Sequence, residues 1–323
     1  MPLSLRRGRV TAVTERLDGL LRLEVDGVAC VAYPGLTGDV EEGDDVLVNE
    51  QARLLGLGSG GFDVLHANLT RGLGLEAEPD AHVMKLPYTP VQHAVRHVEE
   101  DRDLAPELGG LPVVCCTLHS QVLPVLAGLA GTRCAYVQVS GGALPVDLSD
   151  ALRVTAVETV AVGSCFGGGH AAVSVASALA WAASEGFDAA VCSVGPGIVG
   201  TASPLGHGAV AAAEAANAAR ALDGLPVLAA RVSDADPRER HRDVSHHTYA
   251  VLELAFGWPV VAWPRGWQRP DGIDSLTEVD SAGWHEACAG LPLSHMGRGP
   301  DEDPRFFEAA YAAGVLARTL RPT

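Results

Sequence analysis

Lysine is almost missing from this chain of 323 residues, because Lys85 is the only one and nearly all positive charge comes from arginine. Walker-type phosphate loops and Schiff-base enzymes both need a lysine at a defined place in a motif. Lys85 lies between proline and glycine residues without a steady period, which is typical of a connecting segment. The sequence therefore argues against both classes of enzyme.

Paired cysteine motifs and long apolar runs are also missing. The 7 cysteines show no C-x-x-C spacing, so neither a zinc ribbon nor a disulfide framework is predicted. Most lie inside apolar runs, as small core residues do. No run reaches the roughly 18 apolar residues of a membrane helix, and no long apolar region follows the arginines of MPLSLRRGRV. We expect a cytoplasmic protein without a membrane span or signal peptide.

Basic residues are outnumbered, and the formal net charge is -17. Duplex DNA and anionic membranes bind basic surfaces, which displace counterions. We therefore expect no nucleic-acid partner and no membrane partner. A small anionic ligand is still compatible with this balance, provided that arginines gather locally.

The first 65 residues show a β pattern of short apolar runs, VTAV, LLRLEV, VACVAY and DVLVN. Asp26-Gly27 between two valines is a strong signal for a two-residue hairpin. We predict a small β-barrel-like domain over 1–68, a linker over 69–88 and a larger domain over 89–323. The small domain is acidic and has few aromatic residues for stacking bases, so contacts within a homo-oligomer are its expected role.

The larger domain alternates apolar runs with helical patterns. The runs are apolar throughout, as in parallel strands covered on both faces. We predict an α/β fold with a doubly wound parallel sheet and helices on both faces. The expected strands are 112–117, 134–139, 157–162, 189–194, 226–231 and 260–263. The expected helices are 121–129, 169–184, 208–222, 245–256 and 304–319.

A further helix is predicted from about Pro90, with an apolar stripe at 91, 94, 95 and 98. His93 and His97 would lie one turn apart on it, which is a spacing that metal ligands use. No zincin motif surrounds them, so the surface of a helix is the favoured interpretation.

Loops that leave the strands differ from loops that return to them. Returning loops are short and plain, as in LAGTR, SEGFD and LDGLP. Leaving loops are long and rich in glycine or polar residues, as in TLHSQ, SGGALPVD, GSCFGGGH and GPGIVGTASPLGHG. Ligands of open α/β sheets bind at the carboxyl ends of the strands, so this edge is the predicted site.

The glycine loop GPGIVGTASPLGHG contains a G-x-G-x-x-G spacing, but a dinucleotide fold would begin its helix within that motif and place an acid about 20 residues later. Here Pro204 intervenes and Asp234 lies too far away. Amides that hold a phosphate or carboxylate are the alternative that we prefer, with a plain tight turn also open. No cofactor is indicated. The loop contributes Gly195, Gly197, Gly200, Thr201 and His207 to the predicted ligand site.

The densest group of reactive side chains is 231–249, RVSDADPRERHRDVSHHTY, between a predicted strand and a helix capped by Ser245. Its four arginines suit a carboxylate or phosphate and would oppose a dication. Anion binding is therefore preferred over metal binding or a merely ion-paired loop, and no metal is assigned. Arg231 and Arg240 are the predicted anion clamp, and His119 is expected nearby. The predicted catalytic side chains are His246 or His247 as the base, Asp234 to orient it, and His241.

Gly163-Ser164-Cys165-Phe166-Gly167 matches a nucleophile elbow with cysteine in place of serine. A cysteine hydrolase is therefore an alternative, although the histidines follow Asp234 more closely than that fold requires. A small buried thiol is the other interpretation of Cys165. A noncatalytic binding or assembly module is the third class left open.

Several stretches resemble an uncharacterised bacterial family, the domain of unknown function 3866 family. They are GLTGDVEEGDDVLVNEQARLLGLGSGG, YVQVSGGALPVDLS, GPGIVGTASPLGHG and LDGLPVLAARVSDADPRERHRDVSHHTY. The resemblance implies a bacterial cytoplasmic protein without an assigned reaction, and it carries no catalytic roles. The function predicted from the residues is the binding of a small phosphorylated or carboxylated metabolite.

Overall fold

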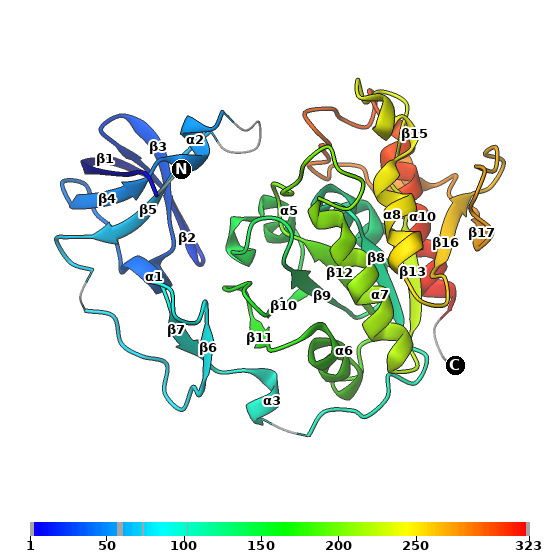
Figure 1. The fold of residues 1–323 in the computed structure, drawn as a ribbon, viewed down its shortest axis with the longest axis horizontal. Coiled ribbons are helices and arrows are strands. Elements are labelled where there is room, and N and C mark those ends of the chain that lie inside the picture. The colour runs from blue at the N-terminus through cyan, green and yellow to red at the C-terminus, as the bar shows by residue number, and fades with distance from the viewer. Residues whose placement is uncertain (1–2, 57–60, 73, 102, 321–323) are drawn as a thin grey trace. The chain divides into compact units, whose positions relative to one another are not determined.

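The computed structural model describes residues 3–56, 61–72, 74–101 and 103–320. The chain forms two compact units, Met1–Arg96 and His97–Thr323, which Figure 1 shows as ribbons. The domain boundaries predicted from the sequence, after residues 68 and 88, stay predictions. Among the described residues, no helix is both long and apolar enough to cross a membrane.

The first unit is built around a closed five-stranded barrel in the order β1-β2-β3-β5-β4. Its interior is lined by alternate residues of each strand, such as Leu21, Leu23 and Val25, as the period of a strand requires. Asp26 and Gly27 have φ values of 52° and 77° and join β2 to β3, which confirms the hairpin. The barrel strands are β1 (Leu5–Leu17), β2 (Leu20–Val25), β3 (Val28–Ala32), β4 (Asp45–Asn49) and β5 (Asp63–Asn68), with short helices α1 (Pro34–Thr37) and α2 (Gln51–Leu54).

The helix predicted from Pro90 is wrong. Strand β7 (His93–Val95) pairs with β6 (Val83–Lys85) in an antiparallel hairpin, and helix α3 (Val98–Asp101) begins only afterwards. The apolar stripe was only two turns long, and strand pairing overrode it. His93 and His97 therefore do not share a helix.

The second unit contains an eight-stranded sheet in the order β11-β10-β9-β12-β8-β13-β16-β17. Every neighbouring pair of these strands is parallel. The predicted α/β fold with a parallel sheet is confirmed. The strands are β8 (Pro112–Cys116), β9 (Cys134–Val139), β10 (Glu158–Val162), β11 (His170–Ala172), β12 (Ala189–Val194), β13 (Leu225–Ala229), β16 (Val260–Pro264) and β17 (Leu276–Val279).

Helices cover both faces of the sheet (Figure 1). One face packs against α6 (Val175–Ser184), α7 (Ala211–Ala221) and α8 (His246–Leu254), and the other against α4 (Val122–Gly128) and α10 (Pro304–Thr319). The backbones of α4 and α10 approach closely at Gly314. A Cβ at this position would lie only 2.1 Å from the carbonyl oxygen of Val125. The shorter helices are α5 (Asp150–Arg153) and α9 (Trp284–Ala287).

The predicted strands of the second unit are all present, but the helix predicted over 169–184 begins late. Its first residues form edge strand β11, and Ser174 caps α6 through the backbone N–H of Ser177. Glycine-rich residues before that cap have no helical preference, so they are free to extend the sheet. Strand β17 and the short hairpin of β14 (Val232–Ser233) with β15 (Asp243–Val244) were also not predicted.

Candidate functional site

The helices that follow three adjacent strands, β12, β8 and β13, do not all lie on the same face of the sheet. β8 leads to α4 on one face, while its neighbours β12 and β13 lead to α7 and α8 on the other. Open α/β sheets bind ligands at the carboxyl ends of the strands, at the point where such a change of face occurs. Gln121 ties two of the loops together, since its amide accepts hydrogen bonds from the backbone after β8 and donates to the carbonyls of Ala229 and Ala230 after β13.

The glycines of the β12 loop pack closely against the loop after β9. A Cβ at Gly195 would lie 2.1 Å from the carbonyl oxygen of Ala143, and one at Gly208 would lie 1.9 Å from that of Gly141. Gly197 has a φ of 69°, and Gly200 pairs with His207 in an antiparallel bridge. The structure therefore uses these glycines for close contact between loops and for a tight turn.

Thr201 also closes its own loop. Its hydroxyl donates to the carbonyl of Gly206 and accepts from the N–H of Ser203. The O–H donor, the only group that a hydroxyl can offer to an anion, therefore has an internal partner. The contribution of this loop to the candidate site is His207, which is 6% exposed.

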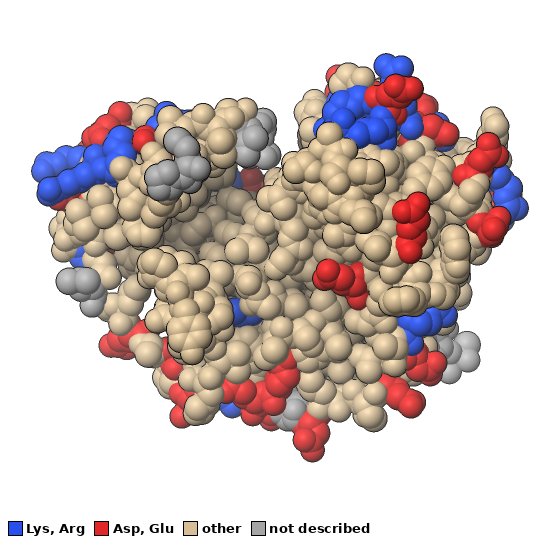
Figure 2. Space-filling model, viewed as in Figure 1, with Lys and Arg blue, Asp and Glu red and all other residues tan. Residues whose placement is uncertain are grey.

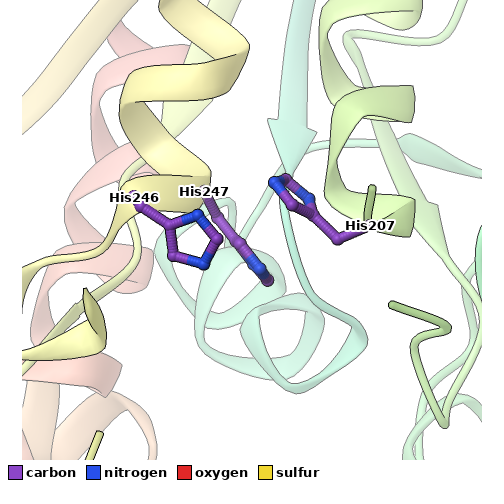
Figure 3. Close-up of side chains that lie close together, drawn as sticks. All are labelled: His207, His246 and His247. Carbon is purple, nitrogen blue, oxygen red and sulfur yellow. The ribbon is translucent and has the colours of Figure 1, made fainter. Parts of the chain in front are cut away.

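His207 lies against two histidines that open α8, His246 and His247 (Figure 3). Its ring stacks on that of His247 with the centroids 3.9 Å apart, and it meets His246 edge-on at 5.1 Å. One ring nitrogen from each histidine can be chosen so that all three lie within 4.8 Å of one another. His241, from the turn η4 (Glu239–His241), lies 4.8 Å from His246 between ring centroids.

Hydrogen bonds fix the tautomers of two of these rings. Nε2 of His207 lies 2.8 Å from the carbonyl oxygen of Pro204, which can only accept, so Nε2 carries the proton and Nδ1 the lone pair. Nδ1 of His207 is buried and has no hydrogen-bond partner, as is Nε2 of His246. Arg231 can only donate, so its bond to Nδ1 of His247, at 3.2 Å, leaves the proton of His247 on Nε2.

The histidines are held in their neutral form. Burial lowers the pKa of His246 to about 4 and that of His241 to about 3, and the charge of nearby arginines acts in the same direction. Burial and Arg231 also lower the pKa of His207 and His247. Neutral imidazoles offer lone pairs at neutral pH, as a general base or a metal ligand must.

Beneath the histidines, one carboxylate faces three arginines. Asp236 is fully buried and pairs with Arg238 at 2.8 Å, Arg231 at 3.2 Å and Arg298 at 3.6 Å. Burial alone would raise the pKa of Asp236, but the hydrogen bonds from Arg238 and the charge of Arg231 hold it well below its usual range. Burial lowers the pKa of Arg231 to about 10, so this guanidinium is still charged at neutral pH.

Two guanidinium groups of this network have buried nitrogen atoms without a hydrogen bond. Nε of Arg231 has no hydrogen-bond partner, and Nη2 of Arg298 has none either, although it forms the ion pair with Asp236 at 3.6 Å. Asp303 accepts from Ser233 at 2.6 Å and from Arg298 at 3.2 Å, but its second oxygen is also buried without a partner. Unpaired buried polar groups are rare in folded proteins, and a group of them indicates a missing ligand, ion or water.

The segment before α10 supplies residues that the sequence analysis missed. His295 is 1% exposed, its Nδ1 lies 3.2 Å from the hydroxyl of Ser120 in the β8 loop, and its Nε2 has no partner. Arg298 and Asp303 join the ion-pair network from the same segment. Their distance in sequence from 231–249 hid them, although the pattern HMGRGPDED carried a comparable mixture of charges.

Four of the predicted site residues have surroundings that differ from the prediction. Asp234 is exposed and bound by Arg305 at 2.6 Å, so the acid inside the cluster is Asp236 instead. Arg240 is exposed in η4, and its charge acts on His246. Basic side chains gather on the surface of this unit near β15 (Figure 2). Arg231 is buried as a partner of Asp236. Nδ1 of His119 donates to the carbonyl of Val194 and Nε2 accepts from Ser149 at 2.6 Å, so both its nitrogens have internal partners.

Cys165 is 0% exposed and packs in the core beside Tyr136 and Val146. A nucleophile must meet its substrate, and this thiol has no access to solvent. The structure therefore favours the small buried thiol among the interpretations of the Cys165 turn.

A closed barrel followed by a doubly wound parallel sheet, with histidine and arginine side chains at a switch point of that sheet, defines a two-unit α/β protein with a candidate ligand site. The family model described as a protein of unknown function (DUF3866) matches residues 29–314, and the chain belongs to this family. No curated protein matches the sequence. The match runs from β3 into α10 and so includes every residue of the histidine cluster and of the network around Asp236.

Proposed function

We propose that the second unit binds a small anionic metabolite, phosphorylated or carboxylated, at the histidine and arginine cluster, and that the neutral histidines act on it by acid–base chemistry. The observation that carries the proposal is the buried guanidinium of Arg231, whose Nε has no hydrogen-bond partner, together with Nη2 of Arg298, which makes no hydrogen bond and has only a long ion pair with Asp236, at 3.6 Å. Guanidinium groups recognise carboxylate and phosphate better than any other side chain does.

Charge supports an anion at this place. The network contains three arginines, Arg231, Arg238 and Arg298, against two buried carboxylates, Asp236 and Asp303. With the histidines neutral, it has one positive charge in excess. A bound anion would neutralise that excess and give the free N–H groups acceptors, which lowers the cost of burying them.

The proposed acid–base role falls on the histidines with free lone pairs. Nδ1 of His207 carries a lone pair without a partner, whereas Nδ1 of His247 is already occupied by Arg231. His207 or His246 is therefore a better candidate for the base than His247. The setting proposed for this activity is the bacterial cytoplasm.

Thermal unfolding in the presence of inorganic phosphate, phosphorylated sugars and short carboxylic acids tests the binding. A ligand that binds only the folded protein raises the melting temperature, by an amount equivalent to about 2.7 kcal/mol at 100 times its dissociation constant. We expect Arg298→Gln to lose the shift. Arg305→Gln is the matched control, because Arg305 pairs with exposed Asp234 and Asp243. Equal shifts in the two variants would contradict the proposal.

A double variant, His207→Ala with His246→Ala, removes both candidate bases and so separates an enzyme from a noncatalytic binding module. In an enzyme, ligand binding persists and turnover of the bound compound is lost. If the wild-type chain binds its ligand but turns over no compound of the panel, the binding module is the better description.

A further inference from the structure

We propose that His207, His246 and His247 together bind one divalent transition-metal ion. The three rings converge from two separate segments, the loop after β12 and the first turn of α8 (Figure 3). Their candidate ligand atoms lie within 4.8 Å of one another before any ion draws them together. Three histidines and an open position are typical of catalytic zinc sites.

His207 has the hydrogen bond that a metal ligand usually has. Metal-bound histidines almost always donate their second ring N–H to a carboxylate or a backbone carbonyl, which fixes the tautomer and the ring. Nε2 of His207 donates to the carbonyl of Pro204 in this way, and the unpartnered Nδ1 lone pair is buried within the cluster. Nε2 of His246 is also buried without a partner, so an ion would satisfy two atoms at once.

His247 connects the ion to Arg231. In the structure its Nδ1 accepts from Arg231. For Nε2 to bind an ion, the ring proton must move from Nε2 to Nδ1, and no proton is gained or lost overall. Nδ1–H can no longer accept from Arg231, so the guanidinium must turn away. Metal binding therefore releases a second donor of Arg231.

Imidazole nitrogen selects the class of ion. Zn²⁺, Co²⁺, Ni²⁺ and Cu²⁺ bind such ligands well, whereas Mg²⁺ and Ca²⁺ prefer oxygen. The nearby arginines oppose a dication, so an anion in the open position would strengthen metal binding. This last step rests on the proposed anion site, but binding of the metal alone does not. With an ion bound, the lone pairs of His207 and His246 serve as ligands and are not available as a base.

Titration of chelator-treated full-length protein with Co²⁺ tests the site, with calorimetry for stoichiometry and visible absorption for nitrogen ligation. We expect one Co²⁺ per chain, no response to Mg²⁺, and at least tenfold weaker binding in His207→Ala and in His246→Ala. His285→Ala is the control, because this exposed histidine lies in α9, outside the cluster. His246 is only partly buried, so its variant is the one more certain to fold, which tryptophan fluorescence checks.

Absence of Co²⁺ binding would overturn the proposal, and so would binding that either His207→Ala or His246→Ala leaves unchanged. Phosphate added to the metal-free protein separates this result from the proposed function. Phosphate binding without Co²⁺ binding refutes the metal site alone, and Co²⁺ binding that phosphate does not strengthen refutes only the coupling to an anion.

Discussion

Both units bury an aspartate among arginines, but the arginine side chains differ in how far they are exposed to solvent. In the barrel, Asp63 is fully buried and accepts from Arg53 at 2.8 Å and Arg6 at 3.2 Å, and the two arginine side chains are 34% and 26% exposed. In the second unit, Asp236 is equally buried, but the side chain of its partner Arg231 is only 3% exposed. Water can solvate both barrel arginines, whereas in the second unit it reaches Arg238 and Arg298, which are 37% and 16% exposed, but not Arg231.

This difference separates a structural ion pair from a candidate binding site. Among the described residues of the barrel, one buried side-chain atom lacks a hydrogen bond, Oε1 of Gln51. Around Asp236 and the histidines, such atoms occur on six side chains within one cluster. Each buried polar group that stays unpaired lowers the stability of the fold by about 1–3 kcal/mol. A cluster with only a structural role would therefore destabilise the second unit. The six side chains are His207, Arg231, His246, His295, Arg298 and Asp303.

The largest effect is expected from Asp236→Asn. The change removes the carboxylate that faces Arg231, Arg238 and Arg298, and it leaves buried positive charge uncompensated. Breaking one partner of a buried ion pair costs about 3–5 kcal/mol, so we expect the second unit to lose stability by that amount. Urea unfolding followed by tryptophan fluorescence measures it, since all 5 tryptophans lie between 181 and 284.

Asp63→Asn in the barrel is the matched comparison. Its arginines can turn to water, so the loss should be clearly smaller, and hydrogen exchange of strands β3 and β5 reports it. If the two substitutions cost the same, the contrast between the units is wrong, and with it the inference that the rim network is organised for a ligand.

The second-largest difference between the units is expected in the pH at which each begins to lose stability. Burial lowers the pKa of His295 to about 3 and that of His119 to about 4, against an ordinary value of about 6.5. Below pH 6.5 these histidines bind protons in the unfolded chain but not in the folded chain. The stability of the second unit therefore falls as the pH drops from 6.5 toward 4, and the full contribution of the neutral histidines is present above pH 6.5.

Barrel stability should respond at lower pH. Burial would raise the pKa of Asp44, but the hydrogen bonds from Arg71, the N–H of Glu41 and Asn68 together outweigh it and hold this pKa below its ordinary value near 4. Its contribution is present above that value and lost only at more acidic pH. Tryptophan fluorescence in urea at pH 7.5, 6.5, 5.5 and 4.5 follows the second unit, and His119→Gln should flatten its slope. Parallel losses in both units at pH 5.5 would refute this ordering.

The sequence predicted the elements well because their signals are local. An apolar run such as 134–139 and a cap such as Ser245 carry their own evidence, and both were placed to within a residue. The hairpin of β6 and β7 was missed because it depends on the pairing of two three-residue strands, which are too short for a clear pattern. The edge strand β11 was missed because it is short and follows glycines.

Most of the predicted site histidines gather at the carboxyl edge of the sheet, but some of their partners differ from the prediction. The change of face between the helix after β8 and the helices after its neighbours depends on strand order, which sequence alone does not contain. Asp234 and Asp236 are indistinguishable in sequence, and only the fold turns one outward to Arg305 and the other inward to three arginines. Residues 295–303 reach the cluster by tertiary packing, for which the sequence has no local signal.

The smallest effect is expected at the cysteines, where the two units should behave alike. Cys30 in the barrel is 2% exposed and Cys165 is 0% exposed, while Cys134 is only partly buried. Iodoacetamide treatment followed by mass spectrometry should label Cys134 first and reach the other two only as the protein unfolds. Fast labelling of Cys165 in the folded protein would restore the cysteine hydrolase as an explanation. Slow labelling at the rate of Cys30 leaves the histidine and arginine cluster as the chemically distinct part of the molecule.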